Sequence, residues 1–415
     1  MEKHKLLVYP VLIITLSSLN CNSVQNELIV KFPNVSEALA ITSGPREHLF
    51  ASYYGINSWS EDQRYVTVLE TSIKYRLPTE NDPATLGLVD LVTNEFIPLT
   101  ETHAWNFQQG CMAHWLGTYP NSRIIYNDLV DGKYVSIIID VHTKEKIRII
   151  PHPVAAVSPN GKEAISINFS RLRTTRESYG YGGEGQDAQL SVQFPKDDGL
   201  FLIDLETGKA ELLVSINDVK EKVPEVPDGG IGYFNHVLFS REGGRIFWLS
   251  RAIPNRNTTA FTVNRDGKNL QRCFPDGWGG SHFDWLNEDE LMITGLYKAE
   301  SNAHILFTPG QENYRRLGNG LLDYDGHGTF SPDGKWMVTD TYPGNKGLYE
   351  QKLYLMDMKT EAVLPMGRYV HPLEFRDNGK DAQCDLHPRW SPKGDMIGYN
   401  SVTTGERQVY IIKLK

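Results

Sequence analysis

Four histidines occupy one position of a recurring sequence pattern. Each stands three residues before an aromatic residue, in the stretches "HVLF" from His236, "HFDW" from His282, "HGTF" from His327 and "HPRW" from His387. Neutral imidazoles that converge on one point bind divalent metal ions, and one without a ligand role can act as a general base. A blander interpretation is that the repeat tolerates a histidine that bonds a neighbouring backbone group. Because the 415 residues contain only 12 histidines, four at one position favour a functional cluster.

The elements that would position these histidines repeat seven times. In each copy an aromatic residue or its equivalent opens a predicted strand, and turns such as "SPDG" lead into a second strand. A further apolar strand follows, as in "LFLIDLETG" and "LYLMDMKT". Two series of seven in strict alternation predict an all-β fold, a seven-bladed β-propeller. The seven equivalent positions, called the anchors, are Trp59, Trp115, Val157, Phe239, Trp285, Phe330 and Trp390.

A propeller would place the four histidines around one part of its central channel. We expect the anchors to lie on the innermost strands, so residues at one offset from them share one height along the channel. In the first three blades that offset holds Ile56, Met112 and Val154, which makes the other side apolar. The chain ends on the apolar strand "VYIIKLK", so "ELIVKF" or "ALAITSG" near the N-terminus should complete the last blade.

The first 21 residues are typical of an export signal. A charged start, "MEKHK", precedes an apolar run that is too short for a convincing membrane span, and Cys21 follows. Cys21 is either the lipidated first residue of a bacterial lipoprotein or part of an ordinary secreted chain, since Asn20 is unusual before a lipidated cysteine. We predict a signal over 1–21, a single domain over 22–415, and a location in the periplasm or at the cell surface, with membrane contact only through Cys21.

The composition narrows the range of partners. A net charge of −9 without basic runs argues against nucleic acid. Beyond Cys21 the chain has three cysteines at irregular spacing, Cys111, Cys273 and Cys384, and an odd number is no disulfide framework. We expect a monomer.

An insertion at about 170–198 separates two anchors by more than one blade. It carries three arginines and two tyrosines before a glycine-rich stretch: Arg171, Arg173, Arg176, Tyr179 and Tyr181. These residues favour a loop that folds over one mouth of the channel, with arginines for carboxylate or sulfate groups and tyrosines for sugar stacking or proton transfer. The alternative is an ordinary packed insertion.

Several of these stretches together resemble a known group of enzymes. The stretches "NHVLFS", "SHFDW", "DGHGTFSPDG", "CDLHPRWSP", "AWNFQQG" and "IIYND" look like those of exported propeller polysaccharide lyases, namely oligogalacturonate lyases and seven-bladed ulvan lyases. The resemblance implies β-elimination on an acidic, uronate-containing polysaccharide or oligosaccharide. One departure stands out: Phe107 and Asn127 occupy positions where ulvan lyases would be expected to have catalytic histidines.

The resemblance also implies roles for individual residues. By the spacing of the lyase histidines, His236 would be the base and His282 a ligand of a divalent metal ion (Mn, Ca or Zn), which His327 and His387 would also bind. Tyr179 and Arg171 complete the predicted catalytic set, and the predicted substrate-binding residues are Arg176, Tyr181 and Gln109. Asp325, Asp385 and Cys384 are possible additional ligands.

Two other classes of function remain open. The chain could be a non-catalytic carbohydrate-binding propeller on the cell surface, because propellers often serve as scaffolds. A glycoside hydrolase would need a pair of carboxylates, for which Asp284, Asp325 and Asp385 beside the anchors are the candidates.

Overall fold

The computed structural model describes residues 30–183, 185, 187–223, 228–255, 257–275, 277–298, 300–344, 349–377 and 382–415. The predicted export signal and Cys21 lie outside the described residues. Residues Phe32–Lys415 form one compact unit. No helix in the described ranges is both long and apolar enough to cross a bilayer.

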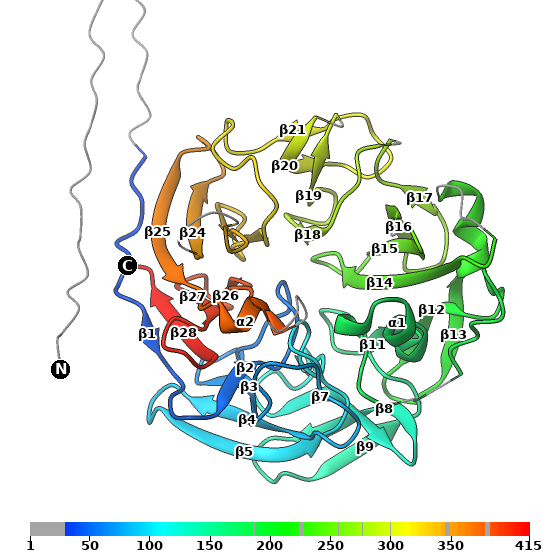
Figure 1. Cartoon of the computed structure of the whole chain (residues 1–415), viewed down its shortest axis with the longest axis horizontal. Helices are drawn as coiled ribbons and strands as arrows, with labels where there is room; N and C mark the ends of the chain where they lie inside the picture. The colour runs from blue at the N-terminus through cyan, green and yellow to red at the C-terminus, as the bar shows by residue number, and fades with distance from the viewer. Residues whose placement is uncertain are drawn as a thin grey trace, which may run out of the picture. The chain divides into compact units, whose positions relative to one another are not determined.

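Seven four-stranded antiparallel sheets form a ring, which confirms the predicted seven-bladed propeller (Figure 1). Blade 1 consists of β2 (Glu47–Phe50), β3 (Tyr65–Thr71), β4 (Ala84–Asp90) and β5 (Glu95–Thr102). Blade 2 consists of β6 (His114–Trp115), β7 (Arg123–Val130), β8 (Lys133–Asp140) and β9 (Lys146–Ile150). Blade 3 consists of β10 (Ala156–Val157), β11 (Glu163–Ser166), β12 (Gly199–Asp204) and β13 (Ala210–Ser215).

The remaining blades repeat this order. Blade 4 consists of β14 (Ile231–Phe239), β15 (Arg245–Ile253), β16 (Asn257–Asn264) and β17 (Gln271–Arg272). Blade 5 consists of β18 (His282–Trp285), β19 (Leu291–Tyr297), β20 (Ser301–Phe307) and β21 (Arg315–Arg316). Blade 6 consists of β22 (Thr329–Phe330), β23 (Trp336–Asp340), β24 (Glu350–Asp357) and β25 (Val363–Val370). Blade 7 consists of β26 (Arg389–Trp390), β27 (Met396–Ser401), β28 (Gln408–Lys413) and β1 (Leu39–Ala40).

Helical structure in the described part of the chain is limited to four short elements. The insertion forms α1 (Phe169–Thr175) and the 3₁₀-helix η1 (Glu177–Tyr179). A second 3₁₀-helix, η2 (Ile216–Lys222), follows blade 3, and α2 (Glu374–Asp377) follows blade 6. Asn168 caps α1 by accepting hydrogen bonds from two backbone N–H groups of its first turn. The helix packs against β14, so the insertion lies beside the strand that carries His236.

Six of the seven anchors lie in the first strand of their blade, as predicted. The exception is in blade 1, where β2 ends at Phe50 and Trp59 makes only an isolated bridge to Val66. Residues 51–58 between them leave the sheet and bring Tyr53 and Tyr54 among the histidines. We call residues 51–58 the plug.

A tight contact between blades 1 and 2 fixes the start of the plug. The carbonyl of Ala51 accepts hydrogen bonds from the N–H groups of Cys111 and Ala113. Gly110, with φ +58°, lies so close that a Cβ atom there would be 2.3 Å from the carbonyl carbon of Ala51. Because any larger residue would push the blades apart, this position of "WNFQQG" requires glycine.

The ring is closed where β1, the first strand, pairs with β28, the last. β1 pairs with β28 through Leu39 opposite Ile411 and Ala40 opposite Tyr410, so "ALAITSG" supplies the closing strand. A buried ion pair joins the same blade to blade 1: the N–H and the guanidinium of Arg407 both donate to Glu47 Oε2, at 3.0 and 3.1 Å. Arg407 also donates to the carbonyls of Lys74 and Ala382.

We expect Arg407→Ala to lower the free energy of unfolding by about 3–5 kcal/mol, because it leaves the Glu47 carboxylate buried without its partner. Urea unfolding followed by circular dichroism measures the change. Arg64→Ala is the control: Arg64 pairs with Asp90 at 2.8 Å, but its side chain is half exposed, so a much smaller loss is expected. Equal losses in both variants would show that the buried pair does not hold the ring closed.

Candidate functional site

The four predicted histidines converge at the inner ends of blades 4 to 7. The ring centroids of His282 and His327 are 4.0 Å apart, and those of His327 and His387 are 4.3 Å apart. The plug links His236 to them: the ring of Tyr53 stacks on His236 at 4.9 Å and meets His387 edge-on at 5.3 Å. We call His236, His282, His327 and His387 the histidine cluster.

One buried carboxylate orders two of the histidines. Asp340, at the end of β23, accepts the backbone N–H of His327 at 2.7 Å and that of His387 at 3.0 Å. It also accepts Nδ1–H of His327 at 2.9 Å. Burial alone would lower the pKa of His327, but the Asp340 carboxylate raises it above its usual value. Because Nδ1 carries the proton for Asp340, Nε2 of His327 faces the cluster as the free ring nitrogen when the ring is neutral.

His282 has a similar support from another acid. Its Nδ1 lies 2.9 Å from Asp325 Oδ1, and its Nε2 lies 3.1 Å from the hydroxyl of Tyr342. The same hydroxyl lies 3.4 Å from Nε2 of His327. Burial and the neighbouring His327 lower the pKa of His282, although Asp325 opposes this shift. His282 is therefore a neutral imidazole at neutral pH.

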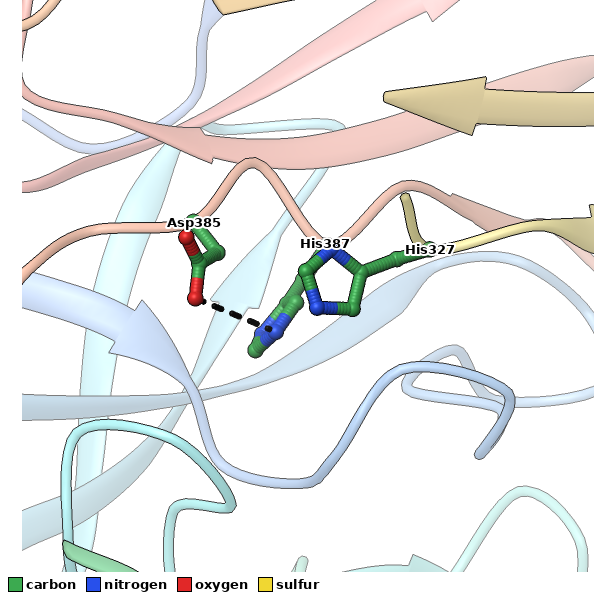
Figure 2. A group of neighbouring side chains, drawn as sticks. All are labelled: His327, Asp385 and His387. Carbon is green, nitrogen blue, oxygen red and sulfur yellow. Dashed lines mark ion pairs between the residues drawn. The ribbon is translucent and has the colours of Figure 1, made fainter. Parts of the chain in front are cut away.

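Three side chains of the cluster have the geometry of a metal site. His327, Asp385 and His387 each offer one ligand atom, and these atoms all lie within 4.8 Å of one another (Figure 2). Nε2 of His387 is 3.9 Å from Asp385 Oδ2, and within the described ranges it is a buried nitrogen without a hydrogen-bond partner. Two imidazoles and a carboxylate suit Mn²⁺ or Zn²⁺, whereas Ca²⁺ prefers oxygen ligands, so of the three predicted metals Ca²⁺ fits least well.

The third predicted ligand, His282, lies next to this group. His282 contacts His327, but Asp385 takes the third place in the group of mutually close ligand atoms. Asp385 is held by Gln383 at 2.6 Å and by Gln108 at 3.3 Å, and burial raises its pKa. The group of mutually close ligand atoms found among the described residues includes Asp385, which was predicted as an additional ligand, and it does not include His282.

His236 differs from the other three histidines in its surroundings. A bulge between Asn235 and Leu238 interrupts the pairing of β14 with β15, and His236 has φ +55°, a left-handed conformation that His387 shares with φ +49°. Bulges and left-handed residues redirect side chains at functional sites, at a cost in strain. The Gln109 amide lies 3.4 Å from Nδ1, and Nε2 is buried without a partner in the described part of the chain. Burial and the charge of Arg251 lower the pKa of His236 well below its usual value, so the ring is neutral.

The insertion reaches His236 with one of its tyrosines. The ring of Tyr179 meets His236 edge-on at 4.7 Å, and the guanidinium of Arg176 lies 5.4 Å from the Tyr179 ring centre. Burial raises the pKa of Tyr179 above its usual value, which keeps its hydroxyl protonated. The structure thus brings together His236, Gln109, Tyr179 and Arg176 of the predicted residues.

Two other predicted residues of the insertion lie away from the cluster. Arg171 donates all five of its N–H groups to backbone carbonyls, namely those of Gly232, Ala188, Gln189, Val192 and Gln193. Because no donor remains for a substrate, the geometry corrects its predicted catalytic role to one of holding the insertion together. Tyr181 stacks on Phe169 at 4.6 Å, and its hydroxyl accepts a hydrogen bond from Asn127. It is a core residue of the insertion and not a substrate contact.

The two departures from the ulvan-lyase pattern also have structural roles. Asn127 donates to the carbonyl of Val154 and accepts its N–H, so it joins blades 2 and 3. The ring of Phe107 lies 4.0 Å below the guanidinium of Arg407. Among the described residues, neither has a hydrogen bond or ring contact with His236.

Sequence reasoning missed several residues that surround the histidine cluster. Tyr53 and Tyr54 lie outside the repeat, and Tyr342 and Arg251 belong to strands or loops that carry no histidine. Asp340 had one usable signal: it directly ends the second strand of the blade that contains His327. Its partner histidines are 13 and 47 positions away, so only the fold reveals the contact.

Unpartnered polar atoms gather around His236. In addition to Nε2 of His236 and His387, the hydroxyl of Tyr53 and the Nε atoms of Arg176 and Arg251 are buried without a partner among the described residues. Buried polar groups are normally paired, so such a group marks a place where a ligand, ion or water completes the bonding. A cavity of about 10 Å³ lies beside Tyr53, Gln109 and His236, which is about the volume that one water occupies.

Comparisons with known proteins support the fold. No protein-family model matches the chain, and no curated protein matches it by sequence. An oligogalacturonate lyase solved in complex with manganese superposes with a TM-score of 0.65 at 14% identity, covering 91% of this chain and 93% of the other. The oligogalacturonate lyase of Vibrio parahaemolyticus superposes with a TM-score of 0.63 at 13% identity and the same coverage. The predicted resemblance to oligogalacturonate lyases is thus confirmed for the architecture of the propeller.

We expect Asp340→Asn to weaken the binding of Mn²⁺ or Zn²⁺ about 10- to 100-fold, because residues that orient a metal ligand have effects of this size. Asp340 fixes the proton on Nδ1 of His327, and an amide cannot accept all three N–H groups. Titration with metal, followed by calorimetry, measures the affinity. Asp357→Asn in the same blade is the control, since Asp357 caps an outer turn. Unchanged affinity in a folded Asp340→Asn protein would contradict the assignment.

We expect Arg171→Lys to loosen the insertion by at least about 3 kcal/mol, since two or more hydrogen bonds from a charged group, each worth about 1.5–3 kcal/mol, are lost. Hydrogen exchange of residues 187–193 reports the change. Arg173→Lys serves as the control, because the ion pair of Arg173 within the described part of the chain is with Glu177, its neighbour one helical turn away. Protection that is equal in both variants would exclude the structural role of Arg171.

Proposed function

We propose that the protein is a lyase that cleaves a uronate-containing polysaccharide or oligosaccharide by β-elimination. The observation that carries the proposal is the set of buried, unpartnered polar atoms of His236, His387, Tyr53, Arg176 and Arg251 at one end of the channel. The set combines imidazoles, the Tyr53 hydroxyl and two guanidinium groups, and the protonated Tyr179 lies beside it. Together these are the parts that elimination next to a carboxylate requires. The likeness of fold to oligogalacturonate lyases agrees with it.

His236 would act as the base. In the reaction its Nε2 takes the C5 proton of the uronate, the C4–O4 bond breaks, and the electron pair of the C5–H bond forms the C4–C5 double bond. Its low pKa keeps the lone pair available at neutral pH. The role requires that Nδ1 carry the ring proton, and the Gln109 side chain offers an acceptor oxygen to Nδ1 after a half-turn of its amide. Gln109 would then position the base instead of contacting the substrate.

Tyr179 would supply the proton to the leaving oxygen O4. It lies edge-on to His236, and its raised pKa keeps the hydroxyl protonated until the leaving group takes the proton. Tyr53 stacks flat on His236 and holds the plane of the imidazole. Base and acid would therefore approach the sugar from adjacent positions.

The uronate carboxylate must be neutralised before C5 becomes acidic. Arg176 and Arg251 have buried Nε atoms without partners beside Tyr179 and His236, and they would donate to the carboxylate. His327, His387 and Asp385 would hold a divalent ion, Mn²⁺ or Zn²⁺, whose charge would further neutralise that carboxylate. The cavity beside His236 is too small for a sugar, so Tyr179 and its neighbours in the insertion must move for a substrate to bind.

The same assay separates this proposal from the two other classes. The purified protein is incubated with a panel of uronate polysaccharides, with and without chelator, and the near-ultraviolet absorbance of unsaturated uronate is followed. Hydrolysis would create reducing ends without that absorbance, and binding alone would create neither. The predicted export signal and the anchor at Cys21, tested by metabolic labelling with a fatty acid, would place the reaction at the cell surface or in the periplasm.

We expect His236→Ala to lower kcat/KM by at least about 10²-fold, as loss of a general base does. Tyr179→Phe should lower kcat by about 10²- to 10⁴-fold, since it removes only the hydroxyl. Tyr181→Phe is the matched control, because Tyr181 is a buried tyrosine of the same insertion without contact to the cluster. Melting temperatures are measured alongside the rates. Full activity of Tyr179→Phe would assign the acid elsewhere.

The pH dependence follows from the low pKa of His236. A base works only when unprotonated, and burial shifts its pKa well below the ordinary value of about 6.5. We therefore expect kcat/KM to stay constant as the pH falls through 6.5 and to decline only at lower pH. A pH–rate profile that falls through an apparent pKa of about 6.5 or above would contradict His236 as the base.

A further inference from the structure

Two further cavities lie at the opposite end of the channel from the histidine cluster. The aromatic chamber, of about 320 Å³, is lined by His114, Trp115, Arg241 and Trp285, among others. The arginine chamber, of about 210 Å³, is lined by Arg241, Arg389 and Trp390, among others. Each anchor of blades 4 to 7 lies three residues beyond its histidine, which is on the inner strand in blades 4 and 5 and two residues before it in blades 6 and 7, so these chambers open at the far mouth.

The two chambers belong to one space, which the plug separates from the histidine cluster. Both are lined by Gly55, Ile56 and Asn57 of the plug, and both are lined by Arg241 and Asp284. Ile56 also lines the small cavity beside His236. A ligand in the far mouth would therefore sit behind the plug and would not occupy the place of a substrate at His236.

Arg389 is a buried cation without a counter-ion. Its side chain is 2% exposed, and its NH1 group donates to the hydroxyls of Ser52 and Ser58 and to the Ser52 carbonyl. Its NH2 group is buried without a partner, and no carboxylate of the described residues forms an ion pair with Arg389. An unpaired buried charge is costly, so an anion that reaches this chamber gains a strong partner.

Arg241 supplies a second guanidinium to the same chamber. Its Nε donates to the carbonyl of Trp285, and its NH2 donates to Asp284 and to the carbonyl of Phe330. The NH1 group makes no hydrogen bond within the described ranges. Asp284 is already occupied, because it also accepts the backbone N–H groups of Trp285 and Phe330. The chamber can therefore accept a negative group in spite of this carboxylate.

The aromatic chamber offers complementary contacts for a sugar ring. Trp115 and Trp285 line the chamber with aromatic rings, the kind of ring that binds the apolar faces of pyranose rings, and they are 9% and 1% exposed. Nδ1 of His114 donates to the carbonyl of Met112 at 2.7 Å, so Nε2 remains as an acceptor for a hydroxyl group. Burial lowers the pKa of His114 to about 4, so this acceptor persists at neutral pH. The volume is at the lower end of the range of about 300–1,000 Å³ for small-molecule sites.

We propose that the far mouth binds a single uronic acid, with its pyranose ring in the aromatic chamber and its carboxylate between Arg241 and Arg389. The inference goes beyond the proposed lyase reaction and does not depend on it, because the chambers lack the base and the tyrosine of the histidine cluster.

Calorimetric titration of the full chain with galacturonate, galactose and acetate tests the proposal. Galacturonate should bind saturably, and galactose and acetate at least about ten-fold more weakly, since each lacks one half of the ligand. The Arg241→Gln variant separates this binding from binding at the histidine cluster, because Arg241 lines the two chambers and not the cavity beside His236. A failure of lyase activity would not affect the titration, so the two proposals fail independently.

Arg241→Gln should weaken galacturonate binding at least ten-fold, about 1.4 kcal/mol. Arg368→Gln is the matched control, because Arg368 is an exposed arginine on β25. Glu61→Gln at the rim of the aromatic chamber should tighten binding about two- to five-fold, since it removes a repelling charge and cannot unfold the core.

Several outcomes would overturn the proposal. It fails if galacturonate does not bind, or if Arg241→Gln and Glu61→Gln both bind it as the natural chain does while melting normally. Acetate binding as tightly as galacturonate would overturn the sugar assignment and leave a site for a free anion only.

Discussion

The buried carboxylate of Asp340 is the interaction on which the candidate site depends. It accepts the backbone N–H groups of His327 and His387 and the ring N–H of His327, and so ties the inner strands of blades 6 and 7 to one point. The electrostatic attraction and hydrogen bond between His327 and Asp340 offset the free-energy cost of burying each side chain. With this carboxylate in place, the free nitrogens of the two histidines lie beside Asp385.

The propeller makes such an arrangement possible because the residues that stabilise the fold are largely different from those that form the candidate site. Blade cores and blade-to-blade contacts outside the histidine cluster, such as those of Gly110 and Arg407, stabilise the ring. The channel can therefore contain groups that weaken a structure, namely His236 in a left-handed conformation and buried atoms without partners. Strain and unsatisfied polar groups persist only where a surrounding fold over-determines them.

The plug gives the channel two separate ends. Tyr53 and Tyr54 pack against the histidines on one side, while Gly55 to Asn57 line the chambers on the other. One short segment of blade 1 thus forms the floor of both. The two ends also differ in their groups: the histidines with Arg176, Arg251 and Asp385 surround one, and Arg241, Arg389 and Asp284 line the other.

The sequence alone determined the propeller, six of its seven anchors and the convergence of the four histidines, because a repeated offset in a repeated blade must recur at one height around the axis. It also indicated that the insertion carries a residue for the site, Tyr179. Only the tertiary structure distinguished Tyr179 from Tyr181 and Arg176 from Arg171, since Tyr181 bonds Asn127 of blade 2 and Arg171 bonds backbone carbonyls of the insertion and of β14. Tyr53 escaped sequence reasoning because its partner His236 comes from another blade. Arg251 and Asp340 escaped it because they lie on second strands of their blades, and their contacts with His236, His327 and His387 join separate segments that share no local pattern in the chain.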